Sequence, residues 1–230
     1  MMRKDTIGRL VKKIVRRNGF DLVRHIGLGE LLSINRVDVV VDIGANDGGY
    51  VQALREDGWE GSVVSFEPQP AAFSRLQERF AGNPNWKGRE LALGEENGTF
   101  EMNIHEMDVL SSFLTKTEKE TSAGKTVSVE MARMDSVFDA VLGSHSRPFV
   151  KIDTQGFERQ VINGFGSRTS DVVGWQLELS VEALYEGQPR IEEILGLMRE
   201  LGFSLWRILP GLRDPRTLRI YEVDGIFFRL

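Results

Sequence analysis

Acidic residues close two apolar segments in the first third of the chain, and a glycine-rich turn follows the first of them. The segment VDVVVDIGANDGG (37–49) places Asp42 at the end of an apolar run and then forms a Gly-x-Asn-x-Gly turn that begins at Gly44. This order is typical of a buried strand that opens into a ligand-binding loop, because glycine lets the backbone turn sharply and approach a ligand closely. Twenty-three residues after Gly44, a second apolar run ends in Glu67. An acid at that place is what nucleoside-binding α/β domains use to hold ribose hydroxyls.

A second group of charged residues lies in two later apolar runs. Lys151 and Asp153 are two apart in the run 148–153, so they point to the same face of the predicted strand and can pair with each other. Glu178 lies near the end of the run 172–179. Because a carboxylate in an apolar strand is costly to bury, we expect Asp153 and Glu178 to have functional roles at the carboxyl edge of the sheet.

The pattern along the chain alternates strand-like and helix-like segments, which predicts an α/β fold with a Rossmann-like, doubly wound, mostly parallel sheet of seven strands. The predicted strands are 37–43, 61–66, 86–93, 148–153, 172–179, 203–209 and 225–230, and the predicted helices 50–57, 68–80, 135–142, 158–165 and 189–201. No helix separates the last two strands, so they form an antiparallel C-terminal hairpin and the sheet should end with one reversed strand.

We expect residues 36–230 to form one catalytic domain, with an insertion at about 97–133 that contains a β-like pair, 99–104 and 126–131, and acts as a mobile lid. Residues 1–35 are expected to form a basic amphipathic helical segment, since eight basic residues against two acidic ones occur in the first 24. Two interpretations stay open for this segment: packing on the domain or on a second copy in a homodimer, and contact with an anionic membrane surface or substrate.

Composition excludes several classes. The chain has no cysteine and only three histidines, which form no metal-binding motif, so thiolate and metal-hydrolase sites are disfavoured. The acidic main body argues against nucleic acid as a partner. No run is long and uncharged enough to cross a bilayer, and no secretion signal is present, so we expect a cytoplasmic protein.

Five motifs in order, DIGANDGGY, FEP, LALGEENGTF, KIDTQGFERQVINGF and QLELS, resemble those of the FkbM-type methyltransferases over about residues 36–229. The resemblance implies a class I methyltransferase fold and S-adenosylmethionine as cofactor, with S-adenosylhomocysteine as product. It also implies O-methylation of a hydroxyl or carboxyl on a polyketide, sugar or glycoconjugate. A small-molecule or glycan acceptor is therefore expected.

The resemblance assigns roles to individual residues. The loop around the methionine part of the cofactor would comprise Asp42, Gly44, Ala45, Asn46 and Gly48. Glu67 would hold the ribose, Ala92 and Leu93 would flank the adenine, and Asp153 would lie beside the methyl group. The catalytic candidates are Asp153, Glu178 and Lys151, and the substrate-contacting candidates are Gln155, Ser111, Ser112 and Tyr185.

Gln155 departs from the commonest family pattern, which has an acid before the glycine of the fourth-strand motif. If that acid normally deprotonates substrate or binds metal, Asp153 or Glu178 must supply the function here, and the amide of Gln155 can instead hydrogen-bond a substrate hydroxyl. The sequence gives no octahedral ligand set for a divalent metal, although the two acids could converge. Two other hypotheses stay open: an NAD-dependent oxidoreductase, which Asn46 and the terminal hairpin disfavour, and a non-catalytic cofactor-binding scaffold of a biosynthetic complex.

Overall fold

A computed structural model describes residues 13, 15–18, 26–104, 125–185 and 187–229 of the chain. Most of the basic N-terminal segment and the middle of the predicted insertion lie outside this part, so the division into an N-terminal segment, a domain and an insertion stays a prediction. None of the helices described combines the length and the apolar character that crossing a bilayer requires.

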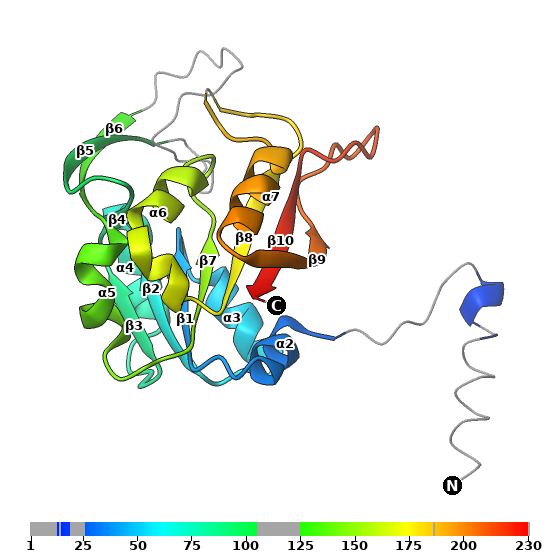
Figure 1. Cartoon of the computed structure of the whole chain (residues 1–230), viewed down its shortest axis with the longest axis horizontal. Coiled ribbons are helices and arrows are strands. Elements are labelled where there is room, and N and C mark those ends of the chain that lie inside the picture. The colour runs from blue at the N-terminus through cyan, green and yellow to red at the C-terminus, as the bar shows by residue number, and fades with distance from the viewer. Residues whose placement is uncertain (1–12, 14, 19–25, 105–124, 186, 230) are drawn as a thin grey trace, which may run out of the picture.

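A seven-stranded sheet forms the centre of the protein, with the spatial order β3-β2-β1-β7-β8-β10-β9 (Figure 1). Its strands are β1 (Val39–Ile43), β2 (Ser62–Phe66), β3 (Trp86–Arg89), β7 (Pro148–Ile152), β8 (Gly174–Ser180), β9 (Phe203–Pro210) and β10 (Glu222–Arg229). The first five in this list pair in parallel, whereas β10 is antiparallel to both β8 and β9. The predicted doubly wound, mostly parallel sheet with an antiparallel C-terminal hairpin is therefore confirmed.

The sequence predicted that the reversed strand would lie at the end of the sheet, and the structure differs on this point. β10 lies between β8 and β9, and β9 forms the edge. The burial of the two strands reflects this order. β10 buries Val223, Ile226, Phe227 and Phe228, whereas most of β9 is exposed or half-buried. At the edge of the sheet, Leu205, Trp206 and Ile208 of β9 stay exposed.

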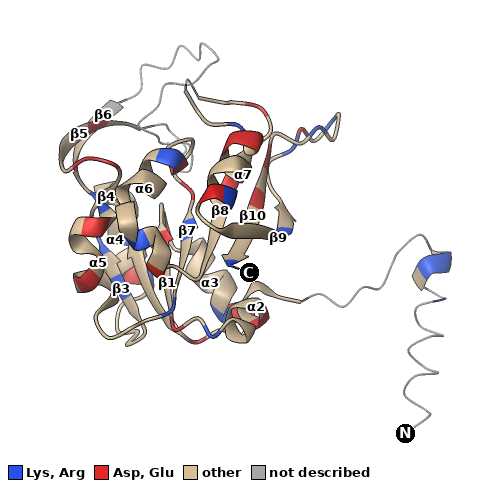
Figure 2. Cartoon of the chain, in the orientation of Figure 1, with Lys and Arg blue, Asp and Glu red and all other residues tan. Residues whose placement is uncertain are grey.

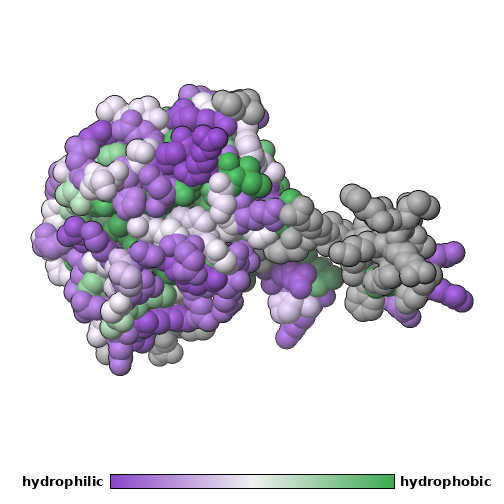
Figure 3. Space-filling view, turned by 90° about the horizontal axis from the view of Figure 1, so that it is seen from below, coloured by the Kyte–Doolittle hydropathy of each residue, from purple (hydrophilic) through white to green (hydrophobic). Residues whose placement is uncertain are grey.

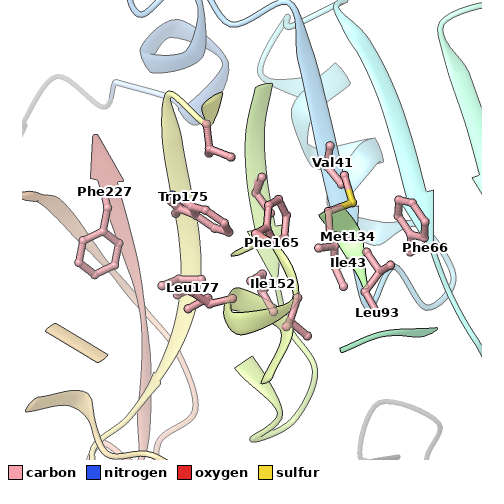
Figure 4. Close-up of a cluster of buried hydrophobic side chains, with 14 of the residues drawn as sticks. Val41, Ile43, Phe66, Leu93, Met134, Ile152, Phe165, Trp175, Leu177 and Phe227 are labelled. Atoms are coloured by element: carbon pink, nitrogen blue, oxygen red, sulfur yellow. The ribbon is translucent and has the colours of Figure 1, made fainter. Parts of the chain in front are cut away.

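Helices cover both faces of the sheet (Figure 1). They are α2 (Leu28–Ile34), α3 (Gly49–Glu56), α4 (Pro70–Arg79), α5 (Met134–Leu142), α6 (Glu158–Gly164) and α7 (Ile191–Glu200). Helices α5, α6 and α7 pack with Val39, Val41 and Ile43 in one apolar core, part of which Figure 4 shows. Helices α2 and α3 pack with Val40 in a second core on the other face. The uninterrupted apolar run of β1 is thus explained by burial on both faces. The face in Figure 3 is mostly hydrophilic, with only small apolar patches.

A second, three-stranded sheet departs from the prediction. The segment 86–93 does not form one strand: β3 ends at Arg89, and Ala92–Leu93 form β4, which pairs in parallel with β6 (Lys125–Ala132). β6 also pairs antiparallel with β5 (Gly98–Ile104), which confirms the predicted β-like pair. The chain leaves the main sheet after β3 because β4 finds its hydrogen-bond partner in β6. This small sheet brings β5 and β6 beside the ends of the main strands.

Candidate active site

A cleft of about 830 Å³, part of it open to solvent, lies at the carboxyl edge of the main sheet. Its lining residues are Ile43, Gly44, Asn46, Phe66, Glu67, Pro68, Ala72, Leu91, Ala92, Leu93, Met102, Asp153, Thr154, Gln155 and Glu178. Polar groups stand at the ends of β1, β2, β7 and β8, and apolar groups come largely from β4 and its neighbours. The cleft therefore offers an apolar slot beside convergent carboxyls.

The loop after β1 is shaped by left-handed backbone at Gly44 (φ 76°), Asn46 (φ 46°) and Gly48 (φ 84°). A side chain at Gly44 would place Cβ 1.9 Å from the carbonyl oxygen of Asp153, so the loop after β1 can approach the end of β7 only because Gly44 has none. The amides of Gly44 and Ala45 both donate to the carbonyl of Phe66 at 3.0 Å. These contacts hold the loop against the ends of the two neighbouring strands.

Glu67 fastens the same loop from the end of β2. Its Oε2 accepts from the amide of Asn46 at 2.8 Å and its Oε1 from the amide of Gln69 at 2.9 Å. Burial raises the pKa of Glu67, and the two backbone hydrogen bonds oppose that shift. Each carboxylate oxygen keeps a further acceptor site, so the residue can still receive hydroxyl donors from a ligand in the cleft.

Asp42 and Lys151 form an ion pair beneath the loop. The register of β1 and β7 places them side by side, and Lys151 Nζ lies 3.3 Å from Asp42 Oδ1, 3.4 Å from Asp153 Oδ2 and 3.1 Å from the carbonyl of Gly44. Asp42 is fully buried and Ser65 also donates to it. Burial alone would lower the pKa of Lys151, but the charges of Asp153 and Asp42 outweigh it and raise that pKa above its ordinary value. The ammonium thus joins the loop after β1 to the end of β7.

Gln155 links the two acids that face the cleft. Its backbone is left-handed (φ 54°), and its Nε2 donates to Asp153 Oδ1 at 3.1 Å and to Glu178 Oε2 at 3.3 Å. The Tyr185 hydroxyl donates to Gln155 Oε1 at 3.2 Å. The amide is therefore oriented with its oxygen toward the phenol and its nitrogen toward the carboxyls.

Glu178 also lies beside a further carboxyl, Glu222, with which it shares a side-chain hydrogen bond. Two carboxyls can share such a bond only if one carries a proton. Burial, followed by the charges of Asp153 and Glu222, raises the pKa of Glu178 far above its ordinary value. Burial raises the pKa of Glu222 as well, so the pair of carboxyls keeps a proton to higher pH than isolated carboxyls do.

Glu158 is a buried acid that caps the turn after β7. Its Oε1 accepts from the amides of Thr154 and Gly156 and from the Thr154 hydroxyl, at 3.1–3.2 Å. Burial raises its pKa to about 7. It fixes the turn that carries Gln155 and does not line the cleft.

The structure brings most predicted site residues together at this cleft. Those that line it are Gly44, Asn46, Glu67, Ala92, Leu93, Asp153, Gln155 and Glu178. Those that lie behind the lining are Asp42, Ala45, Gly48, Lys151 and Tyr185. Ser111 and Ser112 are outside the described residues. Their predicted contact with substrate stays a prediction.

Sequence reasoning missed several residues of the site. Leu91 and Thr154 lie close to the ends of predicted strands, so the sequence pattern could have identified them as lining residues. Met102 reaches the cleft only through the pairing of β4, β6 and β5, and Glu222 meets Glu178 only because β10 lies beside β8. Within the described ranges, no three His, Cys, Asp or Glu side chains are arranged to hold a metal ion.

Comparison with known proteins supplies an independent finding. A model of the methyltransferase FkbM domain matches residues 42–205, which is most of the chain. The curated 2-O-methyltransferase NoeI from Sinorhizobium fredii is 27% identical over 172 residues, covering 70% of each chain.

Solved structures that match this chain include magnesium protoporphyrin IX methyltransferase (ChlM) from Synechocystis PCC 6803 with bound SAM, at 12% identity and a TM-score of 0.46, covering 88% of this chain and 76% of that one. A putative RNA methyltransferase from Pyrococcus horikoshii gives 14% identity and a TM-score of 0.45, covering 88% and 81%.

Proposed function

This chain belongs to the methyltransferase FkbM domain family, and we propose that it is an S-adenosylmethionine-dependent O-methyltransferase whose acceptor is a hydroxyl on a sugar, glycoconjugate or polyketide-type natural product. The observation that carries the proposal is the pair of carboxyls, Asp153 and Glu178, held together by Gln155 on the wall of a cleft whose other polar wall is the loop after β1. The 2-O-methyltransferase relative supports transfer to oxygen.

The residues present fit the methyl donor. Glu67 would accept the ribose hydroxyls, the backbone of Gly44 and Asn46 would border the amino-acid part, and Ala92 with Leu93 would contact the adenine. When bound, S-adenosylmethionine would supply an activated methyl group on its sulfonium. The protein's own task is then to align the acceptor oxygen and remove its proton.

Asp153 is the base in this proposal. A neutral hydroxyl is a weak nucleophile until a base takes its proton. Glu178 shares a proton with Glu222 and so cannot readily accept another, whereas Asp153 lines the cleft with a side chain that is 42% exposed. Protonated Glu178 would instead orient the acceptor by donating to an oxygen of it. Lys151, predicted as catalytic, would act through Asp153 as a positioning residue.

The experiment compares Asp153→Asn with Glu178→Gln in a labelled-methyl transfer assay over a panel of sugars and polyketides. Loss of a general base lowers turnover about 10²–10⁴-fold, and we expect that loss for Asp153→Asn. Glutamine resembles a neutral carboxyl, so Glu178→Gln should lower turnover less than about tenfold. Both variants should bind S-adenosylhomocysteine as the unmodified protein does.

Calorimetric binding distinguishes this proposal from the other two. Affinity for NAD without affinity for S-adenosylhomocysteine would favour an oxidoreductase. Affinity for S-adenosylhomocysteine without transfer to any acceptor in the panel would favour a cofactor-binding scaffold. Equal turnover in both variants and the unmodified enzyme would reject the carboxyl assignment.

A further inference from the structure

The β9–β10 hairpin extends beyond the sheet as an ordered tip, residues 211–221, which Figure 1 shows projecting away from the body. Leu212, Leu218 and Ile220 are 49%, 63% and 48% exposed on this tip. Three of the chain's eight most exposed large apolar residues in the described ranges thus occur within nine positions. Isolated exposed apolar residues need no explanation, but such a concentration at one projecting tip indicates a contact surface.

Hydrogen bonds within the turn hold the tip in this form. Asp214 Oδ1 accepts from the amides of Arg216 and Thr217, and the Leu218 amide donates to the Asp214 carbonyl. Leu218 itself adopts left-handed backbone (φ 61°). A bulky side chain in that region costs free energy, so the turn displays Leu218 to solvent against its local preference.

Arginines alternate with these apolar residues. Arg213, Arg216 and Arg219 lie on the tip, where the only acid is Asp214, whose carboxylate is occupied by the turn. Figure 2 shows the tip as a basic projection. Arg213 faces Ile220 across the hairpin, so a basic and an apolar side chain share one face. A tip that combines apolar residues with flanking arginines matches a bilayer interface, where the apolar groups enter the acyl boundary and the arginines meet lipid phosphates.

The tip also lies on the same edge of the sheet as the cleft. β9 is antiparallel to β10, which is antiparallel to β8, so the carboxyl end of β9 and the carboxyl end of β8 emerge together. The amide of Val181 donates to the Tyr221 carbonyl at 2.8 Å, and Arg219 bonds Glu182 at 2.6 Å. The tip is therefore tied to the segment that follows Glu178.

We propose that residues 211–221 dock the enzyme on an anionic phospholipid bilayer, so that the cleft meets acceptors carried by a membrane lipid. This inference rests on the proposed methyltransferase function for the identity of the acceptor but not for the docking itself. Docking determines the location of the enzyme at the membrane surface. It leaves the carboxyl chemistry of the cleft unchanged.

The test is sedimentation of the full chain with vesicles of phosphatidylcholine alone or mixed with phosphatidylglycerol. The apolar variant is Leu212→Ser/Leu218→Asn/Ile220→Ser, in which asparagine tolerates the left-handed backbone. The basic variant is Arg213→Gln/Arg216→Gln. The matched control is Ile34→Ser on α2, because Ile34 is 63% exposed, like Leu218, but lies away from the tip.

We expect the unmodified protein to prefer the anionic vesicles at least about tenfold, and each tip variant to lose about tenfold or more of that affinity. Ile34→Ser should bind as the unmodified protein does. The proposal is overturned if the unmodified protein does not bind the anionic vesicles, or if both tip variants bind them undiminished. Loss of self-association in the tip variants with no change in vesicle binding would assign the tip to a second copy instead. Affinity for S-adenosylhomocysteine, measured on the same variants, reports separately on folding and on the proposed function.

Discussion

Replacing Lys151 with methionine tests the ion pair beneath the loop. Methionine keeps much of the length and volume of the lysine but removes the ammonium that lies 3.3 Å from Asp42 Oδ1 and 3.1 Å from the Gly44 carbonyl. Asp42 is fully buried and then has only the Ser65 hydroxyl. Removing one partner of a buried pair leaves an uncompensated charge, which costs about 3–5 kcal/mol in typical cases.

Protonation sets an upper limit on that cost. A lone Asp42 can become neutral, at a cost of about 1.4 kcal/mol for each pH unit above its unfolded pKa of about 3.9. The limit is therefore about 4 kcal/mol at pH 7 and about 1.5 kcal/mol at pH 5. Burial already raises the pKa of Asp42 with Lys151 present, so the measured loss at pH 7 should be smaller, about 2–4 kcal/mol.

The sign of the pH dependence follows from the same shift. Without Lys151 the folded pKa of Asp42 rises further above its unfolded value. The contribution of Asp42 to stability is then complete below about pH 4 and is lost as the pH rises through the folded pKa. The deficit of Lys151→Met relative to the unmodified protein should accordingly shrink on acidification from pH 7 to about pH 5.

Urea denaturation at the two pH values measures this deficit, and binding of S-adenosylhomocysteine should weaken in parallel because the Gly44 carbonyl loses its donor. The double variant Asp42→Asn/Lys151→Met, which contains no charge, should recover most of the stability. Lys87→Met, on the exposed surface of β3, is the control and should change little. A loss below about 1 kcal/mol that is equal at both pH values would refute the reasoning.

Two further substitutions test the loop and the amide. Gly44→Ala would bring Cβ against the Asp153 carbonyl, so it should weaken S-adenosylhomocysteine binding at least about tenfold, as measured by calorimetry. The control is Gly58→Ala, which has a similar φ of 80° but no atom within 4 Å of the added Cβ, and it should not weaken binding. An equal effect of both alanines would mean that backbone conformation alone, without the close approach, is responsible. Tyr185→Phe removes the hydroxyl that orients Gln155, so it should lower turnover about tenfold at unchanged cofactor affinity, with Tyr221→Phe as control. Unchanged turnover would show that the Gln155 amide keeps its orientation without this hydrogen bond.

The parts of the site that follow local signals could be predicted from the sequence. Gly44, Asn46 and Glu67 stand at the ends of apolar runs, and such runs end at the same edge of a parallel sheet whatever the details of packing. The contacts between distant segments could not be predicted. The predicted pairing of Lys151 with Asp153 is confirmed, but the second partner, Asp42, meets Lys151 only through the register of β1 with β7. The break between β3 and β4 could not be predicted from the sequence, because the strand that pairs with Ala92–Leu93 lies some 40 residues later, in β6.

The amide at position 155 changes the charge balance of the cleft. An acid there, as in the commoner family pattern, would place a third carboxyl against Asp153 and Glu178, where Lys151 is the nearby cation. Like charges at such distances repel, so at least one further proton or cation would be required. The amide of Gln155 instead donates to both acids, and Tyr185 fixes which end does so. In the proposed mechanism Gln155 thus supports both carboxyls at once, Asp153 as the base and Glu178 as the group that orients the acceptor.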